Sequence, residues 1–297
     1  MLVRKVGQGS FSEVFEVELQ SLSHPTHPAR AALKAIQKKS HPDISQESLE
    51  RSVLHEVDLW KDLIHPNINR MIEFIETADA IFVVSEFCDS GNLFQMIQTH
   101  GALAEFKAIS IVRQVAEAVR YLHLDHRIAH RDIKLENILV DDVSNTVKLC
   151  DFGLSERFAI SPACSFSAMS DFSADNGDVA GIAGSIHYCA PEELQEGATS
   201  PVTGTGCHVS AAASDIWSLG CVLFATVTGT LPFNDDYLPR LQFSIINGRY
   251  DKSRFVDCSV SELCQSLIEG MLQTKIENRL TIEQVLDHPW LKLDQSQ

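Results

Sequence analysis

The segment spanning residues 129–153 constrains the fold of this chain more than any other part of it. Two short apolar runs, residues 138–140 and 147–150, flank a polar turn, and this pattern predicts an antiparallel hairpin. Asn137 leads into the first run and Asp151 follows the second, so both are expected at the same end of the hairpin. Asp132 lies one short loop upstream. Two carboxylates and a carboxamide are oxygen ligands suited to Mg²⁺.

A glycine-rich string near the N-terminus predicts a phosphate-binding loop. Gly7-Gln-Gly9-Ser-Phe-Ser12 can bring backbone N–H groups close to phosphates, because glycine permits tight bends and close approach. Dinucleotide-binding folds use a similar string, but there a helix must follow it. Residues 14–19 instead alternate between apolar and polar side chains and predict a strand. This pattern argues against a nucleotide-binding oxidoreductase.

A lysine in a predicted strand and a glutamate in a predicted helix complete the candidate cluster. Apolar residues recur at helical spacing from residue 44 to residue 64. Glu56 lies beside that stripe, where an unpaired buried charge would be unfavourable. Lys34, in the predicted strand 31–36, can supply the partner cation. The alternative is a glutamate that reaches solvent at the edge of the stripe.

Net charge and cysteine spacing exclude several classes of protein. The chain carries 24 basic and 40 acidic side chains and has a net charge of −16 at pH 7. No basic stripe is present, so we expect no nucleic-acid partner. The longest apolar stretch, residues 216–229, is too short to span a bilayer and predicts a buried helix. Eight cysteines without CxxC spacing indicate reduced thiols rather than a zinc site, which points to the cytoplasm or the nucleus.

Together these strings resemble a eukaryotic protein kinase domain of the serine/threonine type. The resemblance runs from Gly7 to the Asp287-His-Pro-Trp290 ending and rests on several motifs in a fixed order. It implies an α+β, bilobal fold, with an antiparallel sheet and one helix in a small N-lobe and a larger, mainly helical C-lobe. The sequences of residues 231–235 and 287–291 most resemble those of the calcium/calmodulin-dependent and AMP-activated-like group of kinases. The expected boundaries within this single domain are residues 1–85 for the N-lobe, 86–91 for the hinge, 92–297 for the C-lobe and 151–192 for the activation segment.

The resemblance implies transfer of the γ-phosphoryl group of ATP to Ser or Thr hydroxyls of protein substrates, in signalling. Asp132 resembles the catalytic base that orients the attacking hydroxyl, and Lys134 resembles the cation at the transferring phosphate. Lys34 resembles the lysine that holds the α- and β-phosphates, with Glu56 as its helix partner. A catalytically inactive scaffold is the remaining alternative, but such proteins usually lack Lys34, Asp132 or the metal-binding aspartate, and all three are present here.

ATP and Mg²⁺ are the cofactors that the resemblance implies. Asn137 and Asp151 match the two metal-binding residues. Ser85 falls at the gatekeeper position, where a small side chain leaves a back pocket open. The residues expected around ATP are Gly7, Gly9, Ser12, Val14, Ala32, Lys34, Ser85, Glu86, Cys88 and Leu139.

Further residues match structural and regulatory positions of the family. Asp215 would anchor the catalytic loop, and Glu192 would pair with Arg279. Lys134 together with Ser185 is the serine/threonine pattern. The full set is His130, Arg131, Phe152, Ser185, Glu192, Asp215 and Arg279.

Regulation and substrate choice depart from the family pattern. Residues 179–181 lack the hydroxyl that relatives often phosphorylate, yet an arginine such as Arg131 usually receives an anion. We expect Asp178, or a phosphate added by an upstream kinase, to take that place. Glu136 matches an acidic position that reads basic residues in the substrate, although Asn92 and Ala225 replace acidic neighbours, so a moderate basic preference is expected. The residues considered for that phosphate are Ser165, Ser167, Ser170 and Ser173.

Overall fold

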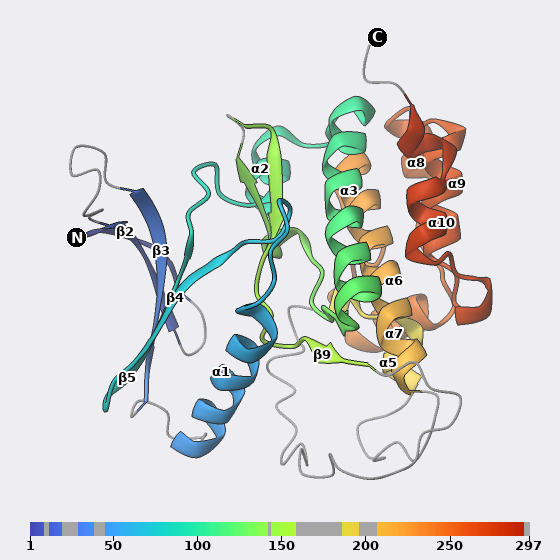
Figure 1. Cartoon of the computed structure of the whole chain (residues 1–297). Coiled ribbons are helices and arrows are strands. Elements are labelled where there is room, and N and C mark those ends of the chain that lie inside the picture. Colours follow the sequence, from blue (N-terminus) through green and yellow to red (C-terminus); the bar gives the residue numbers. More distant parts are fainter. Residues whose placement is uncertain are drawn as a thin grey trace. The chain divides into compact units, whose positions relative to one another are not determined.

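The computed structural model describes residues 1–8, 12–19, 29–38, 45–141, 144–158, 186–195 and 207–293 (Figure 1). The chain divides into two units. The first comprises Met1–Gly91 and Leu139–Ser155, and the second comprises Asn92–Ile138 and Glu156–Gln297.

A five-stranded antiparallel sheet forms most of the first unit. Its strand order is β1-β2-β3-β5-β4. The sequence of β2 alternates, but its burial does not, because Glu16 and Val17, on opposite faces of the strand, are both buried and its other residues are half-buried. The strands are β1 (Leu2–Gln8), β2 (Ser12–Leu19), β3 (Ala29–Gln37), β4 (Met71–Glu76) and β5 (Ala80–Glu86).

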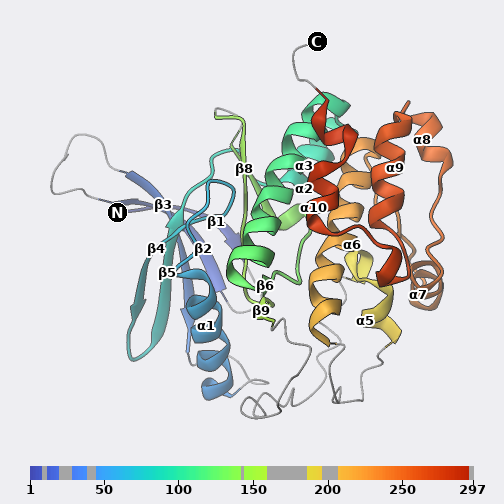
Figure 2. The ribbon, with the colours of Figure 1, turned by 45° about the vertical axis from the view of Figure 1, so that its right-hand side comes forward.

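Helix α1 (Gln46–Trp60) lies beside this sheet (Figure 2). Ser45 caps its N-terminus by accepting a hydrogen bond from the Ser48 backbone N–H. The predicted helix, residues 44–64, is too long. Ile64 lies beyond the last turn and is 69% exposed. The chain turns after Trp60 instead, because the Leu63 N–H donates to the Trp60 carbonyl at 3.0 Å and the Leu63 side chain is buried in place of Ile64.

The predicted hairpin consists of β7 (Ile138–Asp141) and β8 (Thr146–Leu149). From Leu139 onward it belongs to the first unit, because its backbone bonds to that unit. Leu149 N–H donates to the Asn67 carbonyl at 2.9 Å, and Val140 N–H donates to the Gly91 carbonyl at 2.9 Å. The first unit therefore includes residues 139–155, which the expected boundaries assigned to the C-lobe. The lobe boundaries themselves stay a prediction.

The second unit is mainly helical, and the expected α+β fold class is confirmed. Helices α3, α6, α9 and α10 pack against one another in it (Figure 2). Its elements are α2 (Leu93–His100), α3 (Glu105–Arg120), the π-helix η1 (Tyr121–His126), β6 (Ile128–Ala129), the 3₁₀ turn η2 (Leu135–Asn137), β9 (Glu156–Arg157), η3 (Ile186–Tyr188), α5 (Pro191–Gln195), α6 (Cys207–Thr228), α7 (Leu238–Ile246), α8 (Ser253–Asp257), α9 (Glu262–Met271), η4 (Ile276–Asn278), α10 (Ile282–Asp287) and η5 (Pro289–Lys292).

Helix α6 is the central apolar helix of this unit. By length and composition alone its segment Ala211–Thr228 could cross a membrane, but 89% of that segment is buried inside the structure. Trp217 and Leu219 have no exposed surface, and Trp217 stacks on Phe233 at a ring distance of 5.3 Å. A helix that is apolar on all sides is typical of a protein core. The prediction of a buried helix in this stretch is confirmed, but the prediction that the stretch is too short to span a bilayer is wrong, because the apolar segment begins at Ala211 rather than at Ile216.

Candidate active site

Lys34 and Glu56 form an ion pair in the first unit. The Lys34 ammonium, on β3, donates to both carboxylate oxygens of Glu56, on α1, at 2.9 and 3.0 Å. Burial alone would lower the pKa of Lys34, but the carboxylates of Glu56 and Asp151 outweigh it and raise the pKa above its usual value. Glu56 is buried and paired, which excludes the alternative of a glutamate reaching into solvent.

Asp151 follows the hairpin in a left-handed conformation, with a φ of 69°. Aspartate tolerates this region better than most residues. The next residue, Phe152, is fully buried and stacks on Trp60 of α1 at a ring distance of 5.9 Å. This contact ties the segment after the hairpin to the helix that carries Glu56. The Gly153 N–H also lies 3.4 Å from Oδ1 of Asp151.

The residues predicted around the base of ATP also belong to the first unit. Val14 lies opposite Lys34 across the β2–β3 ladder, and Ala32 lies opposite Ser85 across the β3–β5 ladder. Ser85 is buried, and its hydroxyl accepts a hydrogen bond from the Asn69 side chain at 3.4 Å. Leu139 begins the part of the hairpin that joins this unit.

The structure describes the whole predicted hinge, residues 86–91, but only part of the predicted glycine loop. The Glu86 carboxylate accepts from the Lys148 ammonium at 2.6 Å. Burial raises the pKa of the Cys88 thiol to about 11. Gly7 lies in β1 and Ser12 begins β2, whereas Gly9 falls outside the described residues.

Asp132, Lys134 and Asn137 form a second cluster, in the second unit. The Lys134 ammonium donates to Oδ2 of Asp132 at 2.7 Å. The Asn137 amide nitrogen donates to the same oxygen at 2.8 Å and to the Asp132 carbonyl at 2.9 Å. Asp132 and Asn137 are buried. Because the amide nitrogen of Asn137 serves Asp132, the side-chain oxygen of Asn137 is the atom suited to bind a cation.

Asp215 of α6 anchors the backbone of this loop. Its carboxylate accepts from the His130 N–H at 2.8 Å and from the Arg131 N–H at 2.7 Å. His123 also lies 2.8 Å from this carboxylate, a contact that sequence reasoning missed because nothing in the local pattern marks this histidine. Burial alone would raise the pKa of Asp215, but His123 and the loop outweigh it and hold the pKa below its usual value. The anchor holds Arg131 at a φ of 63°.

The side chain of Arg131 binds Glu156. The two are joined by an ion pair of 2.8 Å between Nη1 and Oε2. Sequence reasoning missed Glu156. Asp178 and the four serines, which were expected to provide the anion for Arg131, lie outside the described residues. Ser185 also lies outside them.

Glu192 and Arg279 are also brought together. The Arg279 guanidinium donates to both carboxylate oxygens of Glu192, at 2.7 and 2.8 Å. It donates further to the carbonyls of Ala213 and Gln273 and lies over the Trp217 ring at 5.2 Å. Bidentate Arg–carboxylate pairs are the strong form of ion pair.

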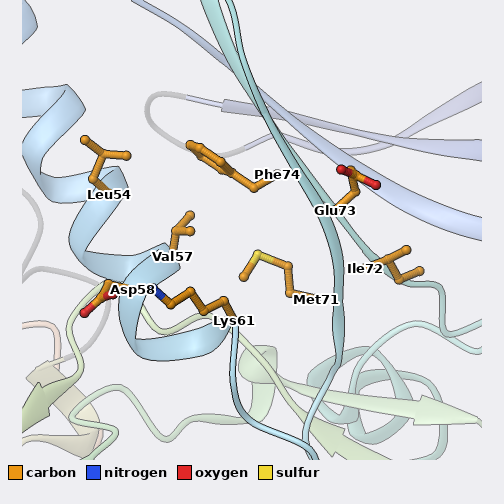
Figure 3. A pocket seen from close by; sticks show the side chains of 8 residues that line it. All are labelled: Leu54, Val57, Asp58, Lys61, Met71, Ile72, Glu73 and Phe74. Atoms are coloured by element: carbon orange, nitrogen blue, oxygen red, sulfur yellow. Dashed lines mark hydrogen bonds and ion pairs between the residues drawn. The ribbon is translucent and has the colours of Figure 1, made fainter.

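A groove of about 640 Å³ lies elsewhere in the first unit, between α1 and β4 (Figure 3). Val57, Met71 and Phe74 form its apolar part, and Lys61 reaches toward Asp58, with which it pairs at 2.6 Å. None of the sequence-predicted site residues lines it. Its full lining is Leu54, Val57, Asp58, Lys61, Met71, Ile72, Glu73 and Phe74.

Comparison with curated proteins identifies similar kinases. The chain is 32% identical to serine/threonine-protein kinase SIK2 of Gallus gallus over 99% of its length, and 33% identical to maternal embryonic leucine zipper kinase of Xenopus tropicalis over 96%. It is also 32% identical to the probable serine/threonine-protein kinase MARK-A of Dictyostelium discoideum over 98%. These matches cover 32%, 38% and 24% of the relatives, so the chain spans well under half of their length. They agree with the predicted AMP-activated-like group.

Similar solved structures and the family comparison also point to a protein kinase fold. The crystal structure of Rad53 1–466 in complex with AMP-PNP matches with a TM-score of 0.74 and 28% identity, over 98% of this chain and 64% of that one. A structure of the Rad53 kinase domain with SCD2 matches with a TM-score of 0.71 and 26% identity, over 94% of this chain and 87% of that one. The family described as "Protein kinase domain" matches residues 1–291. With that match over nearly its whole length, the chain belongs to the protein kinase domain family.

Proposed function

We propose that this protein is a serine/threonine protein kinase that transfers the γ-phosphoryl group of ATP to Ser or Thr hydroxyls of protein substrates in intracellular signalling, in the cytoplasm or the nucleus. The observation that carries the proposal is the cluster of Asp132, Lys134 and Asn137, in which one buried carboxylate oxygen receives both a lysine ammonium and a carboxamide. The similarity to named serine/threonine kinases supports the same assignment.

Positioning and charge neutralisation account for most of the catalysis in this scheme, because phosphoryl transfer needs little covalent chemistry from the protein. Asp132 accepts a hydrogen bond from the substrate hydroxyl and orients it, and Lys134 neutralises charge on the transferring phosphate. Lys34 binds the α- and β-phosphates. Its raised pKa keeps it cationic at neutral pH, and the two hydrogen bonds to Glu56 fix its direction.

Asn137 and Asp151 are proposed to hold Mg²⁺. Their side chains offer a carboxamide and a carboxylate oxygen, the hard donors that this ion prefers, and Asp151 is exposed. The bound ion would neutralise phosphate charge. The use of ATP is supported by the family match and by the AMP-PNP complex of Rad53.

A moderate preference for basic substrates is proposed from Glu136. Its Oε2 atom is buried and has no hydrogen-bond partner among the residues that the structure describes. The Glu136 side chain is half-buried and bonds to the Tyr188 side chain, so a substrate cation would approach the accessible part of this carboxylate, where opposite charges attract. Asn92 caps α2 and Ala225 is buried in α6, so neither adds an acidic group.

An arrayed library of Ser/Thr peptides incubated with the purified protein and Mg²⁺-ATP tests the function. We expect Mg²⁺-dependent labelling that is stronger for peptides with basic residues before the acceptor. Lys34→Met and Asp132→Asn serve as inactive controls. Labelling no greater than that of these controls would favour the catalytically inactive scaffold.

Ser85→Met is expected to raise the half-inhibitory concentration of bulky adenine-site inhibitors by about tenfold or more, because overfilling a packed site typically costs about 1–3 kcal/mol. Ser85 is buried opposite Ala32, and at the gatekeeper position that the resemblance implies for it a longer side chain would fill the space behind the base. The measurement is an inhibitor titration at fixed ATP, with the KM for ATP as control. An unchanged half-inhibitory concentration contradicts the open back pocket.

A further inference from the structure

We propose that Glu156 is a positioning residue that supplies, from within the chain, the anion that Arg131 requires, so that the catalytic loop is set without a phosphate on the activation segment. The inference rests on the proposed function. It replaces the expectation that Asp178, or a phosphate from an upstream kinase, occupies this place.

Arg131 is linked directly to the candidate catalytic residue. It precedes Asp132 in the chain, and its left-handed backbone is held by the hydrogen bond from its N–H to Asp215. A residue other than glycine is strained in this conformation and keeps it only where its surroundings enforce it. The side chain is 41% exposed, so its direction depends on an ionic partner rather than on packing. A change in that partner therefore acts on the loop that carries Asp132.

The backbone of the second unit places Glu156 opposite this loop. Strands β6 and β9 pair antiparallel, with Glu156 facing Ala129, two residues before Arg131. The Phe158 N–H extends the pairing by donating to the Arg127 carbonyl at 2.8 Å. The Phe158 ring meets His123 edge-on at 6.0 Å, and His123 in turn contacts Asp215. The position of Glu156 is thus set by the same elements that anchor the loop.

The charges around Arg131 are unfavourable for a second anion. Burial alone would lower the pKa of Arg131, but the carboxylates of Glu156, Glu193 and Asp215 raise it above its usual value. A phosphate is stabilised by clustered cations and is repelled by neighbouring carboxylates. A phosphate on the same guanidinium would share it with Glu156, which pairs with Nη1 at 2.8 Å, and would lie beside the Glu156, Glu193 and Asp215 carboxylates. The arrangement is that of an arginine that already has its counter-ion.

Phosphatase treatment of the wild-type protein is the first arm of the test. We expect kcat on a reporter peptide to change by less than twofold after all phosphate has been removed, as verified by mass spectrometry. A loss of tenfold or more would overturn the proposal, because it would show that a phosphate, not Glu156, completes the site. This arm does not depend on the folding of any variant.

Glu156→Gln is the second arm. We expect kcat to fall about tenfold, the KM for ATP to stay within twofold and the melting temperature to stay within a few degrees, since a half-exposed pair adds little to stability. Glu156→Asp should recover part of the loss. The exposed Glu283 of α10 provides the control, and Glu283→Gln should leave kcat unchanged.

A double-mutant cycle gives the third arm. If Glu156 acts through Arg131, Glu156→Gln should lower kcat no further in an Arg131→Gln background. Additive losses, or a Glu156→Gln variant with wild-type kcat, would refute the positioning role. A wild-type protein without any activity would instead contradict the proposed function, so the two failures are distinguishable.

Discussion

Replacing Arg279 with methionine is expected to lower the free energy of unfolding by about 3–5 kcal/mol, the usual effect of breaking a buried ion pair. The Arg279 side chain is 1% exposed and Glu192 is 11% exposed, and two hydrogen bonds of 2.7 and 2.8 Å join them. Without the guanidinium, the Glu192 carboxylate stays buried without its counter-ion, and the carbonyls of Ala213 and Gln273 each lose a donor. Urea denaturation of the purified chain measures the change.

Arg240→Met is the matched control for this prediction. Arg240 forms a pair with Asp235 in the same unit, but its side chain is 66% exposed. Exposed pairs contribute at most about 1 kcal/mol, because water competes for both charges. If the free energy of unfolding falls by the same amount in both variants, burial does not increase the contribution of the Arg279 pair, and the prediction fails.

Asp132→Asn is expected to lower kcat by about 10²–10⁴-fold, the range typical of a lost general base. Asparagine has nearly the same shape as aspartate, but its amide cannot accept the proton of the substrate hydroxyl. It also lacks the charge that Lys134 and Asn137 now face at 2.7 and 2.8 Å. Steady-state kinetics on the best peptide of the array provide the measurement.

Two controls separate chemistry from folding in this variant. The KM for ATP should stay within a few-fold, because Lys34 and its partner Glu56 are untouched. Asp125→Asn, an exposed carboxylate at the end of η1, should retain wild-type kcat. A kcat within tenfold of wild type would assign Asp132 a structural role and would return the scaffold to consideration.

Glu156 changes how regulation of this chain is understood. The expected partner of Arg131 was Asp178 or a phosphate, whereas the structure pairs Arg131 with the carboxylate of Glu156, 25 residues further along the chain. If the three arms of the test succeed, activity on peptides would be independent of an upstream kinase acting on residues 159–185. Control of the protein would then have to act elsewhere.

Local patterns predicted several elements because the forces that form them are local. The hairpin at residues 138–149 followed from two apolar runs around a polar turn, and β2 followed from alternation. The same reasoning misplaced the end of α1, because periodicity alone continued the stripe to Ile64, whereas the chain turns after Trp60 and buries Leu63. Elements were thus predicted more reliably than their ends.

The amino-acid sequence alone determined which chemical groups this protein has to work with: a strand lysine, a helix glutamate, and a loop that carries aspartate, lysine and asparagine in family order. The tertiary structure decided which counter-ion each charge receives. His123 reaches Asp215 across 92 residues, Arg279 reaches Glu192 across 87, and Arg131 takes Glu156 as its partner. Such pairs depend on burial and on strand and helix packing between distant segments, which no local pattern encodes.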